Sequence, residues 1–141
     1  MSTLIISPAT PIEADAIRTE LQAFNRRAVG EIAFDSIAFA TRDASGALIG
    51  GFLGDVYLGW LAIDVLWVAQ SQRGSGLGSA LLERAEREAS HRGAKAAYLD
   101  TFEWQAAGFY AKHGYREFGR LADFPDGMSR IFMRKTFAAA P

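Results

Sequence analysis

The stretch from Leu66 to Leu82, LWVAQSQRGSGLGSALL, constrains the fold more than any other part of the 141-residue chain. It begins in an apolar run that is typical of a buried strand, and it ends in apolar residues at helical spacing. Between them, glycines alternate with other residues at positions 74, 76 and 78. Glycine permits left-handed backbone conformations and lets a ligand approach the main chain closely. The stretch therefore predicts a strand, a glycine loop and a helix whose N-terminus is open to a ligand.

The N-terminus of that helix offers a site for an anion. The first N–H groups of a helix have no carbonyl partner, and the helix dipole adds a partial positive charge there. Phosphate fits such a site, and Arg73 at the start of the loop adds a charged donor. A flexible turn without a ligand is the alternative, but three alternating glycines before a periodic helix exceed what a turn requires.

Two other phosphate-binding motifs fit this loop less well. A Walker loop needs Gly-Lys-Ser/Thr at the helix start, where this chain has Gly-Ser-Ala. A Rossmann turn needs a third glycine where Ser79 stands, although Asp100 ends the next strand at about the expected distance. Residues 69–73 also separate the strand from the glycines, whereas a Rossmann turn begins almost at once. A nucleotide- or dinucleotide-binding module stays open as an alternative function.

The composition argues against several other function classes. With 15 basic and 16 acidic side chains, the formal net charge is −1, and no basic stripe predicts a nucleic-acid surface. The absence of cysteine removes disulfides, thiolate metal ligands and a thiol nucleophile together, and suits a cytoplasmic protein. His91 and His113 lack the paired spacing of metal ligands, so no metal is expected. Neither a signal peptide nor a membrane-spanning segment is expected.

The element order predicts a single α/β or α+β domain over residues 1–137 with a mixed sheet, followed by a tail at 138–141. Thr10 is a candidate N-cap, with Pro11 at the first helical position and Glu13 completing a capping box. The expected order is β-α-β-β-β-α-β-α-β-β, with strands at residues 3–7, 32–43, 47–58, 60–68, 95–101, 115–121 and 128–137 and helices at 11–30, 77–92 and 104–114. The apolar face expected for the helix after the glycine loop consists of Leu77, Leu81, Ala85 and Ala89.

Two segments resemble the signatures of one enzyme family. VAQSQRGSGLGSALLERAE resembles the acyl-CoA-binding signature of the GNAT superfamily of N-acetyltransferases, Arg/Gln-x-x-Gly-x-Gly/Ala, which Arg73, Gly76 and Gly78 match. QAAGFYAKHGYREFG resembles the family's second hallmark, a helix with FY followed by GY at the start of a strand. The element order also matches over nearly the whole chain. The resemblance implies a single-domain GNAT-like fold, with a mixed, mostly antiparallel central sheet flanked by helices.

The resemblance also implies acetyl-CoA as the acyl donor and an amine as the acceptor. In this family two neighbouring parallel strands splay apart to admit the cofactor, and here these strands end near Val68 and Thr101. The diphosphate is expected on the amides of the glycine loop and the pantetheine beside the strand that ends at Val68, with the amide of Trp67 or Val68 facing the thioester carbonyl. Gln105 replaces the amide of an asparagine that the family often has nearby. The implied cofactor-binding residues are Leu66, Trp67, Val68, Arg73, Gly74, Ser75, Gly76, Leu77, Gly78, Ser79, Gln105 and Phe109.

Two side chains are candidates for moving protons in direct acyl transfer. Tyr110 matches the tyrosine that family members place near the sulfur, which makes it the candidate general acid, although a packing role stays open. Asp64 interrupts an apolar strand on the alternating face of Leu66 and Val68, and it is the candidate general base, directly or through water; a bulge in the strand would leave the direction of its side chain open. A position at the solvated edge of the acceptor cleft is the alternative for Asp64, and Glu103 is a rival base or acceptor-binding carboxylate.

The acceptor is less constrained than the donor. Phe24, Trp60, Trp104 and Phe124 lie in segments that set acceptor specificity in the family, and aromatic faces near carboxylates hold amines by cation–π contact and charge. A primary amine of a small molecule is therefore expected, while a protein or peptide amine and a non-catalytic acyl-CoA sensor stay open. The resemblance further implies a homodimer, because many relatives pair through sheet edges or C-terminal strands.

Overall fold

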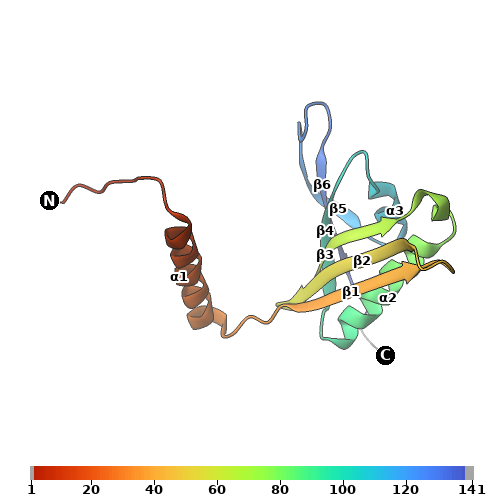
Figure 1. The fold of residues 1–141 in the computed structure, drawn as a ribbon, viewed down its shortest axis with the longest axis horizontal. Coiled ribbons are helices and arrows are strands. Elements are labelled where there is room, and N and C mark those ends of the chain that lie inside the picture. The colour runs from red at the N-terminus through yellow and green to blue at the C-terminus, as the bar shows by residue number, and fades with distance from the viewer. Residues whose placement is uncertain (1, 139–141) are drawn as a thin grey trace. The chain divides into compact units, whose positions relative to one another are not determined.

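The computed structural model of the protein describes residues 2–138, so residues 139–141 of the predicted tail lie outside the described residues. The chain divides into two compact units, Met1–Ala33 and Phe34–Pro141. The first contains α1 (Pro11–Val29) (Figure 1). The second contains β1 (Asp35–Arg42), β2 (Leu48–Tyr57), β3 (Trp60–Val68), a 3-10 turn (Gln70–Gln72), α2 (Leu77–His91), β4 (Ala96–Phe102), α3 (Ala107–Lys112), β5 (Arg116–Leu121) and β6 (Arg130–Thr136).

The start of α1 is fixed by the predicted capping box. The Thr10 hydroxyl accepts a hydrogen bond from the backbone N–H of Glu13 at 3.1 Å, and the Glu13 carboxylate accepts one from the N–H of Thr10 at 3.0 Å. Pro11 occupies the first turn, as predicted. The predicted opening strand at residues 3–7 is wrong, because residues 2–10 form no strand. Residues 2–33 form one helix and no strand, so the N–H and C=O groups of an extended segment find no ladder within this unit.

The sheet of the second unit has the predicted mixed, mostly antiparallel topology. Its strand order is β1-β2-β3-β4-β6-β5, and only the neighbours β3 and β4 run parallel. The apolar strand β3 lies inside the sheet, between β2 and β4. Figure 1 shows α2 lying along the strands β1 and β2. Within residues 2–138, this parallel pair is the one place where the C-termini of two neighbouring strands lie at the same edge of the sheet, so it positions the site.

The core of the second unit lies between α2 and the sheet. Leu81, Ala85 and Ala89 are buried as predicted, whereas Leu77 is only half-buried and Leu82 is fully buried in its place. The sheet supplies the largest fully buried side chains, Phe52, Ile37 and Leu61. Small residues on α2 let the helix approach the strands closely, which fixes its N-terminus relative to the end of β3.

Replacement of Ala85 by valine tests this close approach. Ala85 is 0% exposed, so the two added methyl groups overpack the interface between α2 and the sheet. We expect Ala85→Val to lower the free energy of unfolding by about 1–3 kcal/mol, measured as a shifted midpoint in urea. Ala80→Val is the matched control, because Ala80 lies exposed on the same helix and shares the lower helix propensity of valine. Equal losses in both variants would mean that helix propensity, not packing, limits residue 85.

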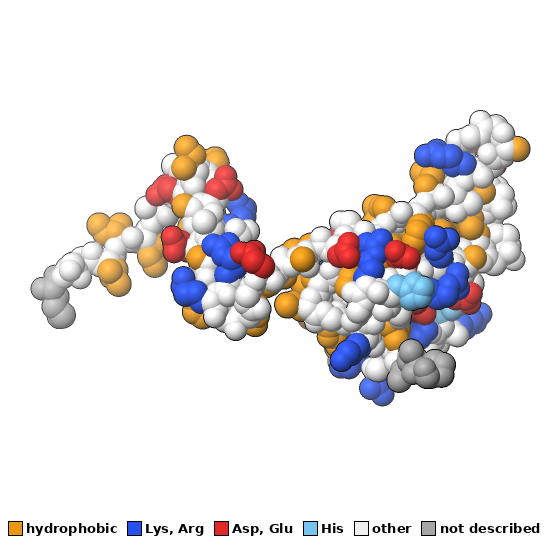
Figure 2. Space-filling view, turned by 90° about the horizontal axis from the view of Figure 1, so that it is seen from below, with side chains coloured by type: hydrophobic (Ala, Val, Ile, Leu, Met, Phe, Trp, Pro, Cys, Tyr) orange, Lys and Arg blue, Asp and Glu red, His pale blue; other side chains and the backbone are white. Residues whose placement is uncertain are grey.

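Charged side chains of both signs are interspersed over the face of the second unit that Figure 2 displays. At the end of α2, Arg92 pairs with Glu88 at 2.9 Å and with Asp35 of β1 at 2.8 Å, which ties the helix to the edge strand.

Among residues 2–138, none of the helices combines the length and apolar content that crossing a bilayer requires.

Candidate active site

The site begins where β3 and β4 separate. Their parallel ladder joins residues 60–62 to residues 96–98 and extends no further. Beyond it, β3 stays paired with β2 up to Val68, and β4 stays paired with β6 up to Phe102. The edge of β3 that faces β4 therefore carries main-chain N–H and C=O groups without a strand partner. The predicted splay of these two strands is confirmed.

A bulge in β3 decides where Asp64 lies. Leu53 of β2 pairs with Val65 and Gly54 pairs with Ile63, so Asp64 is an extra residue without a partner. A Cβ atom on Gly54 would lie 2.7 Å from the carbonyl oxygen of Ala62, so this register needs glycine there. The bulge ends the alternation from which Asp64 was placed on the face of Leu66 and Val68, and that placement is wrong. Asp64 is exposed, whereas Leu66 and Val68 are half-buried.

The glycine loop opens the N-terminus of α2. Gly74 and Gly76 have φ values of 80° and 88°, a conformation that favours glycine, and Gly76 is the N-cap. The first helical hydrogen bond runs from Ala80 to the carbonyl of Gly76. Among the described residues, the N–H groups of Gly76, Gly78 and Ser79 have no acceptor. These donors can hold an anion at the helix N-terminus.

Gly78 has a different role from the other two glycines. An added Cβ would lie 3.5 Å from the ring of Phe109 and 3.6 Å from the side chain of Val68, which is ordinary contact. The first turn of α2 thus packs on α3 and on the end of β3. This contact brings the helix that carries Tyr110 next to the anion site.

Tyr110 projects from α3 into the same space. The side chain is 7% exposed, and burial raises the pKa of its hydroxyl to about 12. Within residues 2–138 this hydroxyl has no hydrogen-bond partner, yet no buried side-chain oxygen or nitrogen is left unpartnered. The hydroxyl is therefore open to the pocket, and it stays protonated at neutral pH.

The turn before α3 is held by Gln105. Its side-chain oxygen accepts hydrogen bonds from the Thr101 hydroxyl at 3.1 Å and from the N–H of Phe102 at 2.9 Å. Because both donors lie at the end of β4, Gln105 fixes α3 to the splayed strand. Its amide oxygen is thus committed to the protein.

A hydrogen bond between the two helices was not foreseen from the sequence. The Ser79 hydroxyl lies 2.9 Å from Nε2 of His113, and the His113 ring packs 4.7 Å from that of Phe109. His113 is the C-cap of α3. The contact joins residues 34 positions apart, and no local pattern marks it.

These elements enclose a pocket of about 810 Å³, within the range of small-molecule sites. Among residues 2–138, no group of three or more histidine, aspartate or glutamate side chains is arranged to hold a metal. The predicted residues that line the pocket are Asp64, Leu66, Trp67, Val68, Arg73, Gly74, Gly76, Leu77, Gly78, Ser79, Gln105, Phe109 and Tyr110.

Two predicted residues lie elsewhere, and the pocket has six lining residues beyond the predicted catalytic and cofactor-binding ones, of which Trp104 was expected on the acceptor side. Ser75 is turned away, with its hydroxyl donating to the carbonyl of Gln72, and Glu103 pairs with Arg120 at 3.4 Å. The additional lining residues are Val65, Gln72, Asp100, Thr101, Trp104 and Ala106. The expected splay was the signal that could have found Asp100 and Thr101, because both lie at the free end of β4.

Residues 9–115 match the sequence model of the Acetyltransferase (GNAT) family. The chain belongs to the GNAT acetyltransferase family. This GNAT protein is 33% identical over 134 residues to acetyltransferase Atu2258 of Agrobacterium fabrum, a match that covers 94% of this chain and 98% of the relative. It is 42% identical over 91 residues to the blasticidin-S acetyltransferase of Streptomyces morookaense, covering 64% of this chain and 67% of the relative.

A solved structure agrees with these relatives. An acetyltransferase from Bacillus cereus, known from its crystal structure, is 34% identical in sequence to this GNAT protein. The two structures superpose with a TM-score of 0.89 over 95% of this chain and 98% of the Bacillus cereus chain. The protein is thus an acyltransferase with the mixed α/β fold of its family.

Proposed function

We propose that this GNAT protein transfers an acetyl group from acetyl-CoA directly to a primary amine of a small molecule. The observation that carries the proposal is one pocket that joins three features. It contains the unpartnered amides at the start of α2, the free edge of β3 and the open hydroxyl of Tyr110. A phosphate-bearing thioester needs all three, because its diphosphate, its amide-containing arm and its sulfur are different chemical groups.

The chain's own groups suit the three parts of acetyl-CoA. The N–H groups of Gly76, Gly78 and Ser79 bind the diphosphate, and Arg73 adds a charged contact at the rim of the pocket. The free edge of β3 from Leu66 to Val68 pairs with the pantetheine amides as an added strand would. When bound, acetyl-CoA supplies a thioester whose carbonyl carbon is open to attack.

The protein then moves two protons and stabilises one charge. Asp64 takes a proton from the acceptor ammonium, directly or through water, so that the nitrogen gains a free electron pair. The N–H of Trp67 or Val68 donates to the thioester oxygen as negative charge develops there. Tyr110 donates its proton to the departing sulfur as the carbon–sulfur bond breaks and the carbon–nitrogen bond forms, and it regains a proton from the second one that the nitrogen releases, directly or through water. The products are an acetamide and free coenzyme A.

A small-molecule acceptor is supported by a relative's name and by the pocket. The relative from Streptomyces morookaense is named for the small molecule blasticidin S. The pocket wall also carries the exposed indole of Trp104 and the exposed carboxylate of Asp64, two groups that hold an amine by cation–π contact and charge. A homodimer, which the family resemblance implied, and a cytoplasmic location, which the absence of cysteine suggested, stay predictions.

The decisive experiment is acetyl-CoA turnover against a panel of small amines and peptides, followed by release of free thiol. We expect thiol release that depends on a small primary amine, together with coenzyme A binding in a calorimetric titration. Transfer to peptide amines alone would mean that the acceptor is a protein or peptide amine and not a small molecule. Coenzyme A binding without turnover of any amine would favour an acyl-CoA sensor, and binding of ATP or NAD in place of coenzyme A would overturn the site assignment.

A further inference from the structure

The pocket has walls from both faces of the sheet. On β4, Leu99 and Thr101 are buried, whereas Asp100 between them is exposed on the opposite face of the strand. Both Asp100 and Thr101 line the pocket, because β3 and β4 are no longer paired at this level. The donor site lies on the α2 side of the sheet. The residues on the opposite face, outside the donor site, are thus available to an acceptor.

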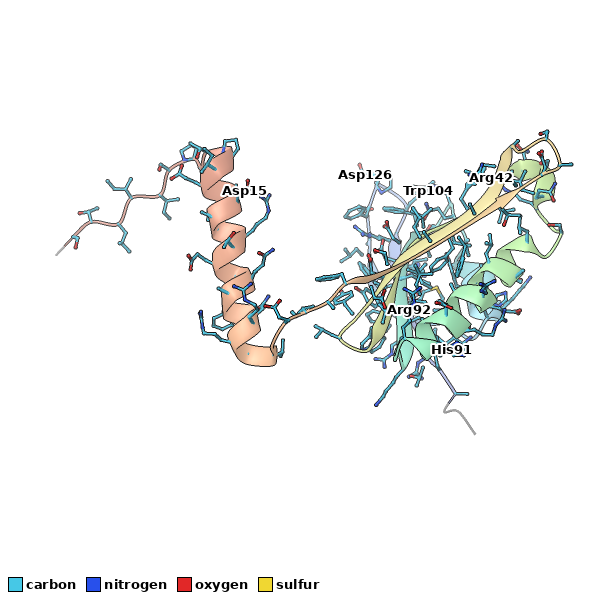
Figure 3. The ribbon with its side chains drawn as sticks, turned by 60° about the horizontal axis from the view of Figure 1, so that its bottom comes forward. Asp15, Arg42, His91, Arg92, Trp104 and Asp126 are labelled. Atoms are coloured by element: carbon cyan, nitrogen blue, oxygen red, sulfur yellow. The ribbon has the colours of Figure 1, made fainter. Side chains whose placement is uncertain are left out.

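An aromatic platform lies on that opposite face. The indole of Trp104 stacks on the ring of Phe102, with 4.5 Å between the ring centroids and 14° between the ring planes. The centroid of the Phe102 ring lies 5.6 Å from that of the Phe124 ring. Trp104 is nevertheless 54% exposed and lines the pocket. Figure 3 shows Trp104 toward one end of the second unit and His91, the last residue of α2, toward the other. Because Phe102 covers one face of the indole and the Trp104 side chain is still half exposed, the other face of the indole is open.

A neighbouring arginine shows which ligand chemistry this platform accepts. The guanidinium of Arg130 lies 5.6 Å from the centroid of Phe102 and 5.2 Å from that of Phe124. Its Nε donates to the carboxylate of Asp100 at 2.7 Å. A planar cation is thus already bound by aromatic faces and a carboxylate at the pocket wall. Because Arg130 neutralises Asp100, this carboxylate offers no net charge to a ligand.

Asp64 is the acidic pocket residue that remains available. In the part of the chain that the structure describes, its carboxylate takes part in no ion pair and no side-chain hydrogen bond. The basic residue of the pocket lining, Arg73, lies in the glycine loop, at the end of the pocket assigned to phosphate. Negative charge at Asp64 and an open indole at Trp104 are therefore the two unfilled binding features on the acceptor side.

We propose that the acceptor carries a planar unsaturated group, such as an aromatic or heteroaromatic ring, close to its amine. The planar group stacks on the open face of Trp104, and the ammonium binds at Asp64. This inference rests on the proposed function of the pocket and narrows its substrate class. Trp104 is thereby a specificity-determining residue, because saturated amines of the same size lose the stacking contact but keep the charge contact.

The test compares amines that differ only in ring saturation. Benzylamine and cyclohexylmethylamine have the same carbon skeleton, and their binding to coenzyme A-saturated protein is measured by ligand-detected NMR titration. Binding is compared instead of rate, because ring saturation also changes the basicity of the amine. We expect benzylamine to bind about five- to tenfold more tightly to the wild-type protein.

Three variants assign the preference to its residues. Trp104→Ala should abolish the difference between the two amines, and Trp104→Phe should retain it. Phe118→Ala is the control, because Phe118 is an aromatic side chain of β5 that is 57% exposed and lies outside this pocket. Equal binding of both amines to the wild type, or a preference that survives Trp104→Ala, would overturn the inference. Thiol release is measured in parallel to separate this inference from the proposed function. If the protein binds planar amines through Trp104 but does not acetylate them, the proposed acetyl transfer is wrong, while the preference of the pocket for planar amines stands.

Discussion

Gly76→Val should weaken coenzyme A binding about 100-fold or more. Gly76 has a φ of 88° and is the N-cap of α2, where a side chain costs about 1–2 kcal/mol of backbone strain. The loop relieves this strain by leaving the left-handed region, which turns the N–H groups of Gly76 and Gly78 away from the diphosphate. Two charge-assisted hydrogen bonds are lost, each contributing about 1.5–3 kcal/mol. Calorimetric titration with coenzyme A measures the effect.

Gly46→Val provides the matched control for this variant. Gly46 lies in the turn between β1 and β2, and its φ of 87° nearly equals that of Gly76. An added Cβ meets nothing within 4 Å at either glycine, so the two substitutions impose the same backbone strain and no clash. We expect Gly46→Val to lose comparable stability in urea and to bind coenzyme A as the wild type does. Equal affinities of the two variants would reject the glycine loop as the diphosphate site.

The sequence patterns that lie within one element or one connection were predictive. In the glycine loop, Gly74 and Gly76 adopt the positive φ values that glycine favours, and the capping box at Thr10 forms as the spacing predicted. The splay of β3 and β4 followed from the family resemblance, and the strand register bears it out. Apart from the splay, these features depend on local hydrogen bonds and backbone conformation, which neighbouring residues encode.

Features that depend on pairing between distant segments were missed. The opening strand at residues 3–7 is apolar enough, but a strand also needs a neighbour, which its own composition does not specify. The bulge that displaces Asp64 depends on the register of β2 against β3, and in particular on Gly54. The pairing of Arg130 with Asp100 and the bond of Ser79 to His113 join side chains about 30 positions apart or more. Each of these features arises from tertiary packing, and the periodicity of the sequence carries no information about contacts between distant segments.

Tyr110→Phe should lower kcat about 100- to 1,000-fold while leaving the affinity for coenzyme A unchanged within about threefold. The substitution removes one hydroxyl that has no protein partner and faces the pocket, so it leaves no buried group unsatisfied. The lost function is the proton that the departing sulfur needs. Pre-steady-state measurement of thiol release separates this chemical step from product release.

The pH dependence of kcat adds a second signature for the same residue. Burial raises the pKa of Tyr110 to about 12, above the ordinary value of a tyrosine near 10, so the neutral, proton-donating form persists as the pH rises. The wild-type protein should therefore show no alkaline decline of kcat from this group up to about pH 10. The loss in Tyr110→Phe should also stay constant over that range, because the group it removes does not change its charge there.

Tyr115→Phe distinguishes the acid role from a packing role. Tyr115 is also buried, and its ring packs against that of Tyr110 at 5.7 Å, but its hydroxyl donates to Glu86 at 2.8 Å and does not line the pocket. Removing this hydroxyl leaves Glu86 with Lys135 alone, so Tyr115→Phe should cost stability, about 1–3 kcal/mol, and not kcat. If both variants lost stability and neither lost kcat, Tyr110 would be a packing residue, and the departing sulfur would take its proton from water.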